Sequence, residues 1–132
     1  MIHKYRKLKT SWGIAIDVDI TITKNYNFSL QENLLKLSEN IFLEIDDSIF
    51  IDEANWVKKG VTDMIEYITQ EVDILPIHIK LNKLIFNFVD FQEEGIYCAI
   101  QEGISKELDI NYPKVNVSYN KVVNRYIFSI EN

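Results

Sequence analysis

The chain has 132 residues, of which 47% are hydrophobic and 12% are aromatic, and its formal net charge is −6. This length and apolar content predict one folded domain over residues 1–132. The acidic balance repels phosphate backbones, so nucleic acid is not an expected partner. No apolar run is long enough to suggest a membrane span. The single cysteine, Cys98, excludes an intramolecular disulfide and suits the cytoplasm.

The N-terminal third predicts strands after a basic leader. Residues 1–10 are rich in cations and are expected to form a flexible leader. Residues 12–23 alternate strictly between apolar and polar side chains, which predicts a half-buried antiparallel strand whose polar face carries Asp17 and Asp19. The Ser29–Glu32 spacing resembles a capping box, so residues 30–38 are expected to form a short helix or a connection. Residues 41–45 and 48–51 predict strand, with a turn at 46–47 between them.

One pattern occurs twice in the rest of the chain: an acidic helix start, an amphipathic helix, a proline and two short strands. The first copy predicts a helix over 55–72 and strands over 77–81 and 84–89, with a turn at Asn82-Lys83. The second predicts a helix from 92–94 to Leu108 and strands over 115–119 and 126–130, with a turn at Asn120-Lys121. Helices that alternate with hairpins indicate an α+β fold with a largely antiparallel sheet and two principal helices in repeated helix-strand-strand units.

Several carboxylates are expected on one face of this sheet. If the strand with Asp17 and Asp19 pairs with the strand predicted over residues 41–45, then Glu44 and Asp46 lie on the same sheet face. Their mutual repulsion requires relief by water, by Lys80, by a divalent cation or by a basic protein partner. A plain solvated face remains the simplest interpretation, since exposed charged residues usually have no further role.

The sequence contains no motif that predicts catalysis. It has no glycine-rich phosphate loop, no Cys-x-x-Cys pair and no Gly-x-Ser-x-Gly elbow, and its two histidines are His3 and His78. We therefore assign no catalytic residue, no metal ligand and no cofactor. A nucleophilic pair of Cys98 and His78 is conceivable, but an outward histidine and a thiol on the wet side of a helix explain the same residues.

Residues 90–97 form the most distinctive string in the chain. Asp90 or Gln92 can cap the following helix, while Glu93 and Glu94 complement its positive end. The alternative is a recognition loop in which the aromatic residues Phe91 and Tyr97 act as anchors.

Residues 90–99, together with Asn124-Arg125-Tyr126-Ile127-Phe128, resemble the small acidic immunity proteins of bacterial polymorphic toxin and contact-dependent inhibition systems. The resemblance implies a cytoplasmic, non-enzymatic protein that binds and neutralises a basic toxin domain, often a nuclease. The predicted partner-binding residues are Asp17, Asp19, Glu44, Asp46, Asp90, Phe91, Gln92, Glu93, Glu94 and Tyr97. Two alternatives stay open: a metal-dependent hydrolase that uses a carboxylate cluster, and a structural subunit of a larger assembly.

Overall fold

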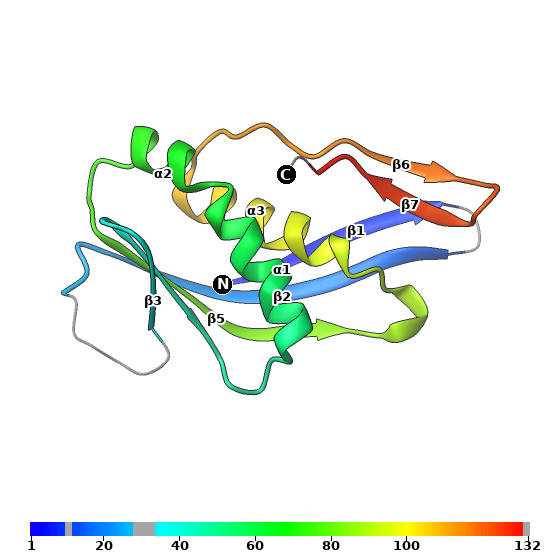
Figure 1. The fold of residues 1–132 in the computed structure, drawn as a ribbon, viewed down its shortest axis with the longest axis horizontal. Coiled ribbons are helices and arrows are strands. Elements are labelled where there is room, and N and C mark those ends of the chain that lie inside the picture. Colours follow the sequence, from blue (N-terminus) through cyan, green and yellow to red (C-terminus); the bar gives the residue numbers. More distant parts are fainter. Residues whose placement is uncertain (10–11, 28–33, 131–132) are drawn as a thin grey trace.

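The computed structural model describes residues 1–9, 12–27 and 34–130 and places helices against one face of a sheet (Figure 1). The strands of the sheet are β1 (Ile2–Lys9), β2 (Trp12–Lys24), β3 (Leu34–Ser38), β4 (Ile41–Ile45) and β5 (Ile77–Phe86). The helical elements are α1 (Ile51–Thr62), α2 (Ile65–Glu71), the 3₁₀ turn η1 (Phe88–Asp90) and α3 (Glu94–Leu108). A separate hairpin consists of β6 (Val117–Asn120) and β7 (Arg125–Phe128).

The strand order in the sheet is β1-β2-β5-β4-β3. Three of its four strand pairs are antiparallel, and β4 pairs with β5 in parallel. The parallel pair exists because α1 and α2 carry the chain over one face between these strands, which a short turn cannot do. The predicted α+β fold in a single domain, with a largely antiparallel sheet, is therefore confirmed.

The first of the two predicted hairpins is wrong, and β5 is instead one continuous strand. The register against β2 shifts from Asp19↔Lys83 to Ile20↔Leu81, so Asn82 is the extra residue of a β-bulge. The bulge moves the apolar face from odd to even residue numbers, and this phase change imitates a turn in the sequence. The second predicted hairpin is confirmed as β6 and β7, although the αββ pattern does not repeat.

The expected leader is also ordered: its first nine residues are described, and residues 2–9 form the edge strand β1. It pairs with β2 from Ile2↔Asp19 to Lys9↔Trp12. His3 and Tyr5 are buried, whereas Lys4 and Arg6 are exposed. The charged residues concealed this period-two pattern in the sequence.

Three local expectations need correction. Residues 34–38, expected within a short helix, form strand β3, while residues 28–33 lie outside the described part of the chain. Residues 48–51 form a turn and the start of α1 instead of a strand. The predicted helix over 55–72 divides at Asp63–Met64, where ψ is −10° and −6° and the Met64 amide donates to the Val61 carbonyl in 3₁₀ fashion.

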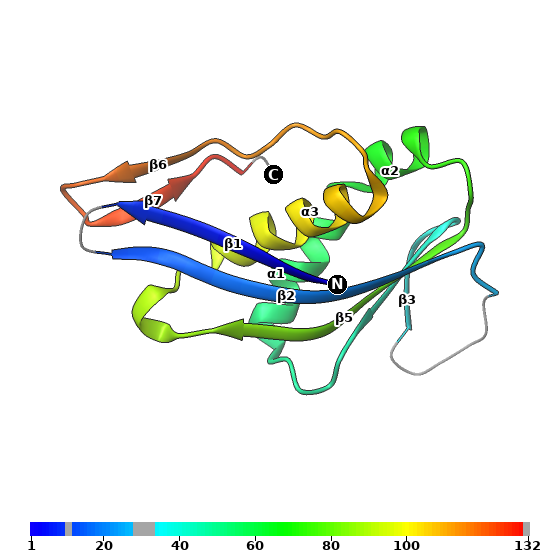
Figure 2. The same ribbon diagram turned by 180° about the vertical axis from the view of Figure 1, so that it is seen from behind.

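The core lies between the sheet and the helices. Ile16, Val18 and Ile20 of β2 have no exposed surface and face α3, while α1 packs beside α3. A Cβ at Gly60 of α1 would lie 2.5 Å from a methyl carbon of Ile100, so the absence of a side chain lets the two helices approach. Figures 1 and 2 show the helices on the same side of the sheet, and no described helix covers its other face.

Candidate functional site

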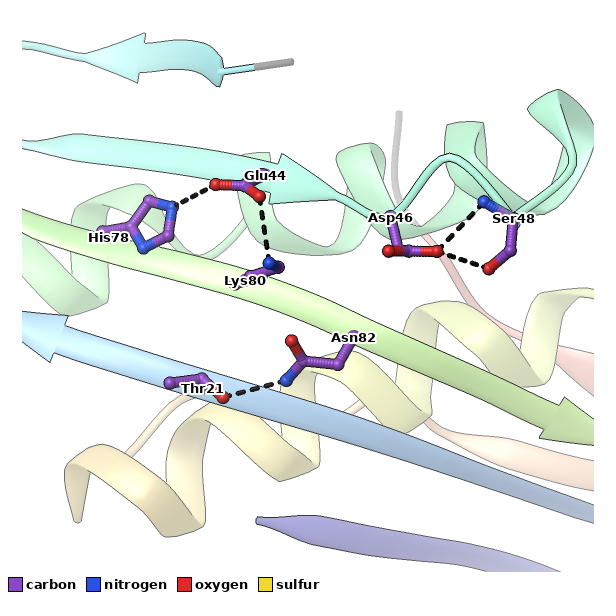
Figure 3. Close-up of polar contacts among 7 residues, drawn as sticks. All are labelled: Thr21, Glu44, Asp46, Ser48, His78, Lys80 and Asn82. Carbon is purple, nitrogen blue, oxygen red and sulfur yellow. Dashed lines mark hydrogen bonds and ion pairs between the residues drawn. The ribbon is translucent and has the colours of Figure 1, made fainter. Parts of the chain in front are cut away.

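The face of the sheet that the helices leave uncovered carries three of the four carboxylates that the sequence placed together on a sheet face. Because side chains alternate along a strand, Asp17 and Asp19 of β2 point to this face while Ile16 and Val18 enter the core. Glu44 of β4 reaches the same face, as Figure 3 shows together with its neighbours on β5. The expectation of a shared sheet face is therefore met for Asp17, Asp19 and Glu44 but not for Asp46, which lies beyond the end of β4.

Glu44 is the centre of a polar cluster that joins β4 and β5. The parallel register places it opposite Lys80, whose Nζ lies 3.2 Å from Glu44 Oε2. His78 Nε2 lies 3.0 Å from Glu44 Oε1 (Figure 3). The His78 ring also stacks on Tyr26, with centroids 4.6 Å apart. Of the sources of relief that the sequence suggested, the structure contains Lys80.

The predicted contact between the two acidic strands is wrong, because β5 lies between β2 and β4. Neighbouring strands are about 4.8 Å apart, so β2 and β4 are separated by about 10 Å. Each carboxylate of β2 has its own cation instead. Asp17 Oδ1 lies 2.7 Å from Arg6 Nη2, and Asp19 Oδ1 lies 3.4 Å from the amino group of Met1.

Asp46 lies just beyond the end of β4 and does not join this cluster. Its carboxylate accepts hydrogen bonds from the Ser48 amide at 3.0 Å and the Ser48 hydroxyl at 2.5 Å (Figure 3). These bonds lower the pKa of Asp46 from its ordinary value, with a smaller contribution from Lys80. Nearby, the Asn82 side chain donates to the Thr21 hydroxyl at 2.8 Å and ties the bulge to β2.

Within the distinctive string at 90–97, the structure buries two of the residues that the sequence analysis assigned to partner binding, Gln92 and Tyr97. The side chain of Gln92 is buried, donates to the Tyr126 carbonyl at 2.6 Å and accepts from the Tyr126 amide at 3.1 Å. Tyr97 is also buried, and its hydroxyl donates to Asp63 Oδ2 at 2.6 Å. Burial together with this hydrogen bond raises the pKa of Tyr97.

The other residues of the string lie nearer to solvent. Phe91 stacks on Phe86 with centroids 3.9 Å apart, and Asp90 ends the turn η1. Glu93 is exposed, while Glu94 lies 3.7 Å from Arg125 of the hairpin. The predicted side-chain cap is absent, because Glu93 is the N-cap residue of α3 and makes no capping hydrogen bond.

Cys98 and His78 do not form a nucleophilic pair. Cys98 is buried on α3 beside Tyr5, so its predicted place on the wet side of the helix is wrong. His78 points to the opposite, uncovered face of the sheet. Burial raises the pKa of the Cys98 thiol to about 11, which keeps it protonated and unreactive.

Sequence reasoning missed a group of exposed apolar side chains near the starts of α1 and η1. Its members are Phe50, Ile51, Ile85, Phe88 and Val89. Within this group, Phe50 and Phe88 expose 77% and 81% of their surface. The sequence did contain one signal of this group. The apolar pair Phe88-Val89 directly precedes Asp90, so a strand that included this pair would have to end abruptly.

Comparison with known proteins does not assign the chain to a family. No protein-family model matches the sequence, and no curated protein matches it. Within residues 1–9, 12–27 and 34–130, no three His, Cys, Asp or Glu side chains are grouped so that they could hold a metal ion. In the same ranges, no helix has the length and apolar character needed to cross a bilayer.

Proposed function

We propose that this chain is a non-enzymatic binding protein, and specifically an immunity protein that binds and neutralises a basic toxin domain. The observation that carries the proposal is the distribution of charge. Residues 46–73 hold eight acidic and two basic side chains, so this segment alone has a formal charge of −6. The remainder of the chain is balanced, with twelve of each sign, so the whole net charge comes from α1, α2 and their connections.

The acids of this segment are largely available to a partner. Asp47, Asp52, Glu66 and Asp73 are exposed, and among the described residues the one ion pair of the segment joins Lys59 to Asp63 at 3.5 Å. The sheet face differs, since Asp17, Asp19 and Glu44 each have a cation nearby. The helical segment is therefore the stronger source of negative potential, which speeds association with a basic protein.

The same proposal places the protein in the cytoplasm, where an incoming toxin would act. Its one cysteine is free and buried, which suits a reducing compartment. The proposed contact with the toxin uses exposed acids of residues 46–73, together with Asp90 and Glu93 of the string before α3.

A metal-dependent hydrolase is the weaker alternative. It requires the carboxylates of β2 and β4 to converge, and β5 holds them apart. Saturable binding of Mg²⁺, Mn²⁺ or Ca²⁺ that disappears in Asp19→Asn would revive this alternative. A stable oligomer in solution would favour the third possibility, a structural subunit.

The test uses candidate toxin domains encoded next to the gene for this chain. The affinity tag belongs at the C-terminus, because the Met1 amino group donates to the Ile20 carbonyl at 2.8 Å. We expect a sub-micromolar complex with one basic domain and protection of cells that express this domain. Failure of every neighbouring product to bind, or robust catalysis by the purified chain, would reject the proposal.

Charge-reversal variants then test whether the acidic segment of residues 46–73 attracts the partner. The double variant Asp47→Lys/Glu66→Lys should slow association several-fold at low salt, with a smaller effect at high salt. The control Glu39→Lys/Glu107→Lys changes the net charge equally but lies outside residues 46–73. Equal slowing by both variants would mean that total charge, and not the acidic segment, guides the partner.

A further inference from the structure

A groove of about 400 Å³ lies between the β4–α1 connection and the end of β5. Its walls are mainly apolar: Ile49 and Phe50 come from the connection, and Ile85, Phe86 and Phe88 come from β5 and η1. Glu53 and Lys83 supply charged groups to the lining. Two segments that are far apart in the sequence therefore build one concave surface.

The groove exposes aromatic surface that a monomeric protein normally buries. Phe50 and Phe88 are largely exposed, and the neighbouring Ile51 and Val89 extend the apolar surface. Exposed aromatic side chains in a concave site are the usual anchors of a protein interface. This surface lies at the N-terminal end of the acidic segment of residues 46–73.

Aromatic contacts support the floor of the groove. Phe86 stacks on Phe91 at 3.9 Å, and Phe88 meets Phe86 edge-to-face at 5.3 Å. Because these rings support one another, a ligand finds the surface already formed and loses less entropy on binding. Phe91, which the sequence suggested as an anchor, supports this surface from below.

The charges around the groove favour a basic partner. The lining segments, residues 46–53 and 83–90, carry five acidic side chains and a single basic one, Lys83. Asp47 and Asp52 are exposed beside Phe50. An acidic partner would be repelled, and a purely apolar one would leave these carboxylates without a counterion.

We propose that this groove is the docking site for a segment of the basic partner, in which an apolar side chain inserts between Phe50 and Phe88 and flanking Lys or Arg residues meet Asp47, Asp52 and Glu53. The inference rests on the proposed function and names the contact through which the toxin domain is held. The apolar insertion slows release, while the flanking charges speed association.

The first test is an NMR titration of the ¹⁵N-labelled protein with a synthetic peptide that has a central Phe-Leu pair flanked on each side by two lysines. Amide shifts should concentrate in residues 48–53 and 83–89. A peptide with Ser-Ser at its centre should bind at least tenfold more weakly, which corresponds to about 1.4 kcal/mol. If the shifts spread over α2 and do not depend on the central pair, charge alone attracts the peptide and the proposed docking site is rejected. Absence of binding would also reject it.

The second test uses Phe88→Ala, with Val122→Ala as the control. Both side chains are highly exposed, so both variants should fold, and Phe88→Ala should lower the unfolding midpoint only slightly through the loss of its edge-to-face contact with Phe86. Phe88→Ala should weaken the peptide and the toxin domain at least tenfold, and Val122→Ala should affect neither. If a toxin domain binds and Phe88→Ala does not weaken it, the groove is wrong and the proposed function stands. If the peptide binds as expected but no toxin domain does, the groove stands and the immunity function fails.

Discussion

Replacement of Gln92 by Ala should loosen the C-terminal hairpin from the rest of the protein. The Gln92 side chain makes two buried hydrogen bonds to the backbone of Tyr126, at 2.6 and 3.1 Å. Each bond contributes about 1 kcal/mol, and desolvated Tyr126 groups left behind add a similar penalty, so the expected loss is about 3 kcal/mol. Unfolding entropy of about 2.1 cal/mol/K per residue over 132 residues converts this loss into a fall in Tm of about 10 °C.

The assay combines thermal and urea unfolding with amide hydrogen exchange. Exchange at the Tyr126 amide should accelerate even if the hairpin detaches without unfolding the sheet. Gln70→Ala is the matched control, because Gln70 is exposed and its amide lies 3.4 Å from Glu66 one turn away, so stability should change by less than about 0.5 kcal/mol. A loss below about 1 kcal/mol with unchanged exchange at Tyr126 would refute the proposed role of Gln92.

Three further outcomes follow from the packing and the charges. Gly60→Ala should lower the free energy of unfolding in urea by about 1–2 kcal/mol, because the added Cβ would lie 2.5 Å from Ile100. This crowding outweighs the better helix propensity of alanine. A stabilised variant would contradict the close contact between the two helices. Burial of the Cys98 thiol raises its pKa from 9.0 to about 11 on folding. The stability that the protonated thiol contributes is therefore complete below pH 9 and is lost as the pH rises toward 11. Cys98→Ala should reduce this fall in the free energy of unfolding. Lys80→Met removes the ion pair with Glu44 and should lower the free energy of unfolding in urea by less than about 1 kcal/mol at low and high salt, because Glu44 keeps His78 at 3.0 Å. A loss above about 2 kcal/mol would show that the Lys80–Glu44 pair behaves as a buried one.

The predictions that agree with the structure are those that depend on residues close together in the sequence. Strand β2 and helix α3 were predicted closely, because thirteen and fifteen residues of clear periodicity report their own environment. The Asn82-Lys83 pair was misinterpreted, since a bulge and a turn both interrupt the alternation and only the pairing partner distinguishes them. Residues 2–9 were misinterpreted because cations on one face of an edge strand resemble a solvated leader.

The candidate site divides in the same way. The alternation of β2 was enough to place Asp17 and Asp19 on a polar face, but it gave no information on which strand lies beside them. The roles of Gln92 and Tyr97 depend on Tyr126 and Asp63, each 34 residues away, and local sequence contains no trace of such contacts. Phe50 and Phe88 were expected within strands, and their exposure was not predicted, because hydrophobicity alone does not reveal which apolar side chains lack a neighbour.

By itself, the sequence determined the α+β class, the single domain, the surplus of acid and the period of the longest elements, because these depend on composition and on residues close in the chain. The tertiary structure decided which strands are neighbours, and thereby gave each sheet carboxylate its own cation and separated β2 from β4. It also brought residues 46–53 beside residues 83–90 to form the groove. The physical reason is that strand order and side-chain exposure follow from how all the apolar faces are buried together, which no local segment specifies.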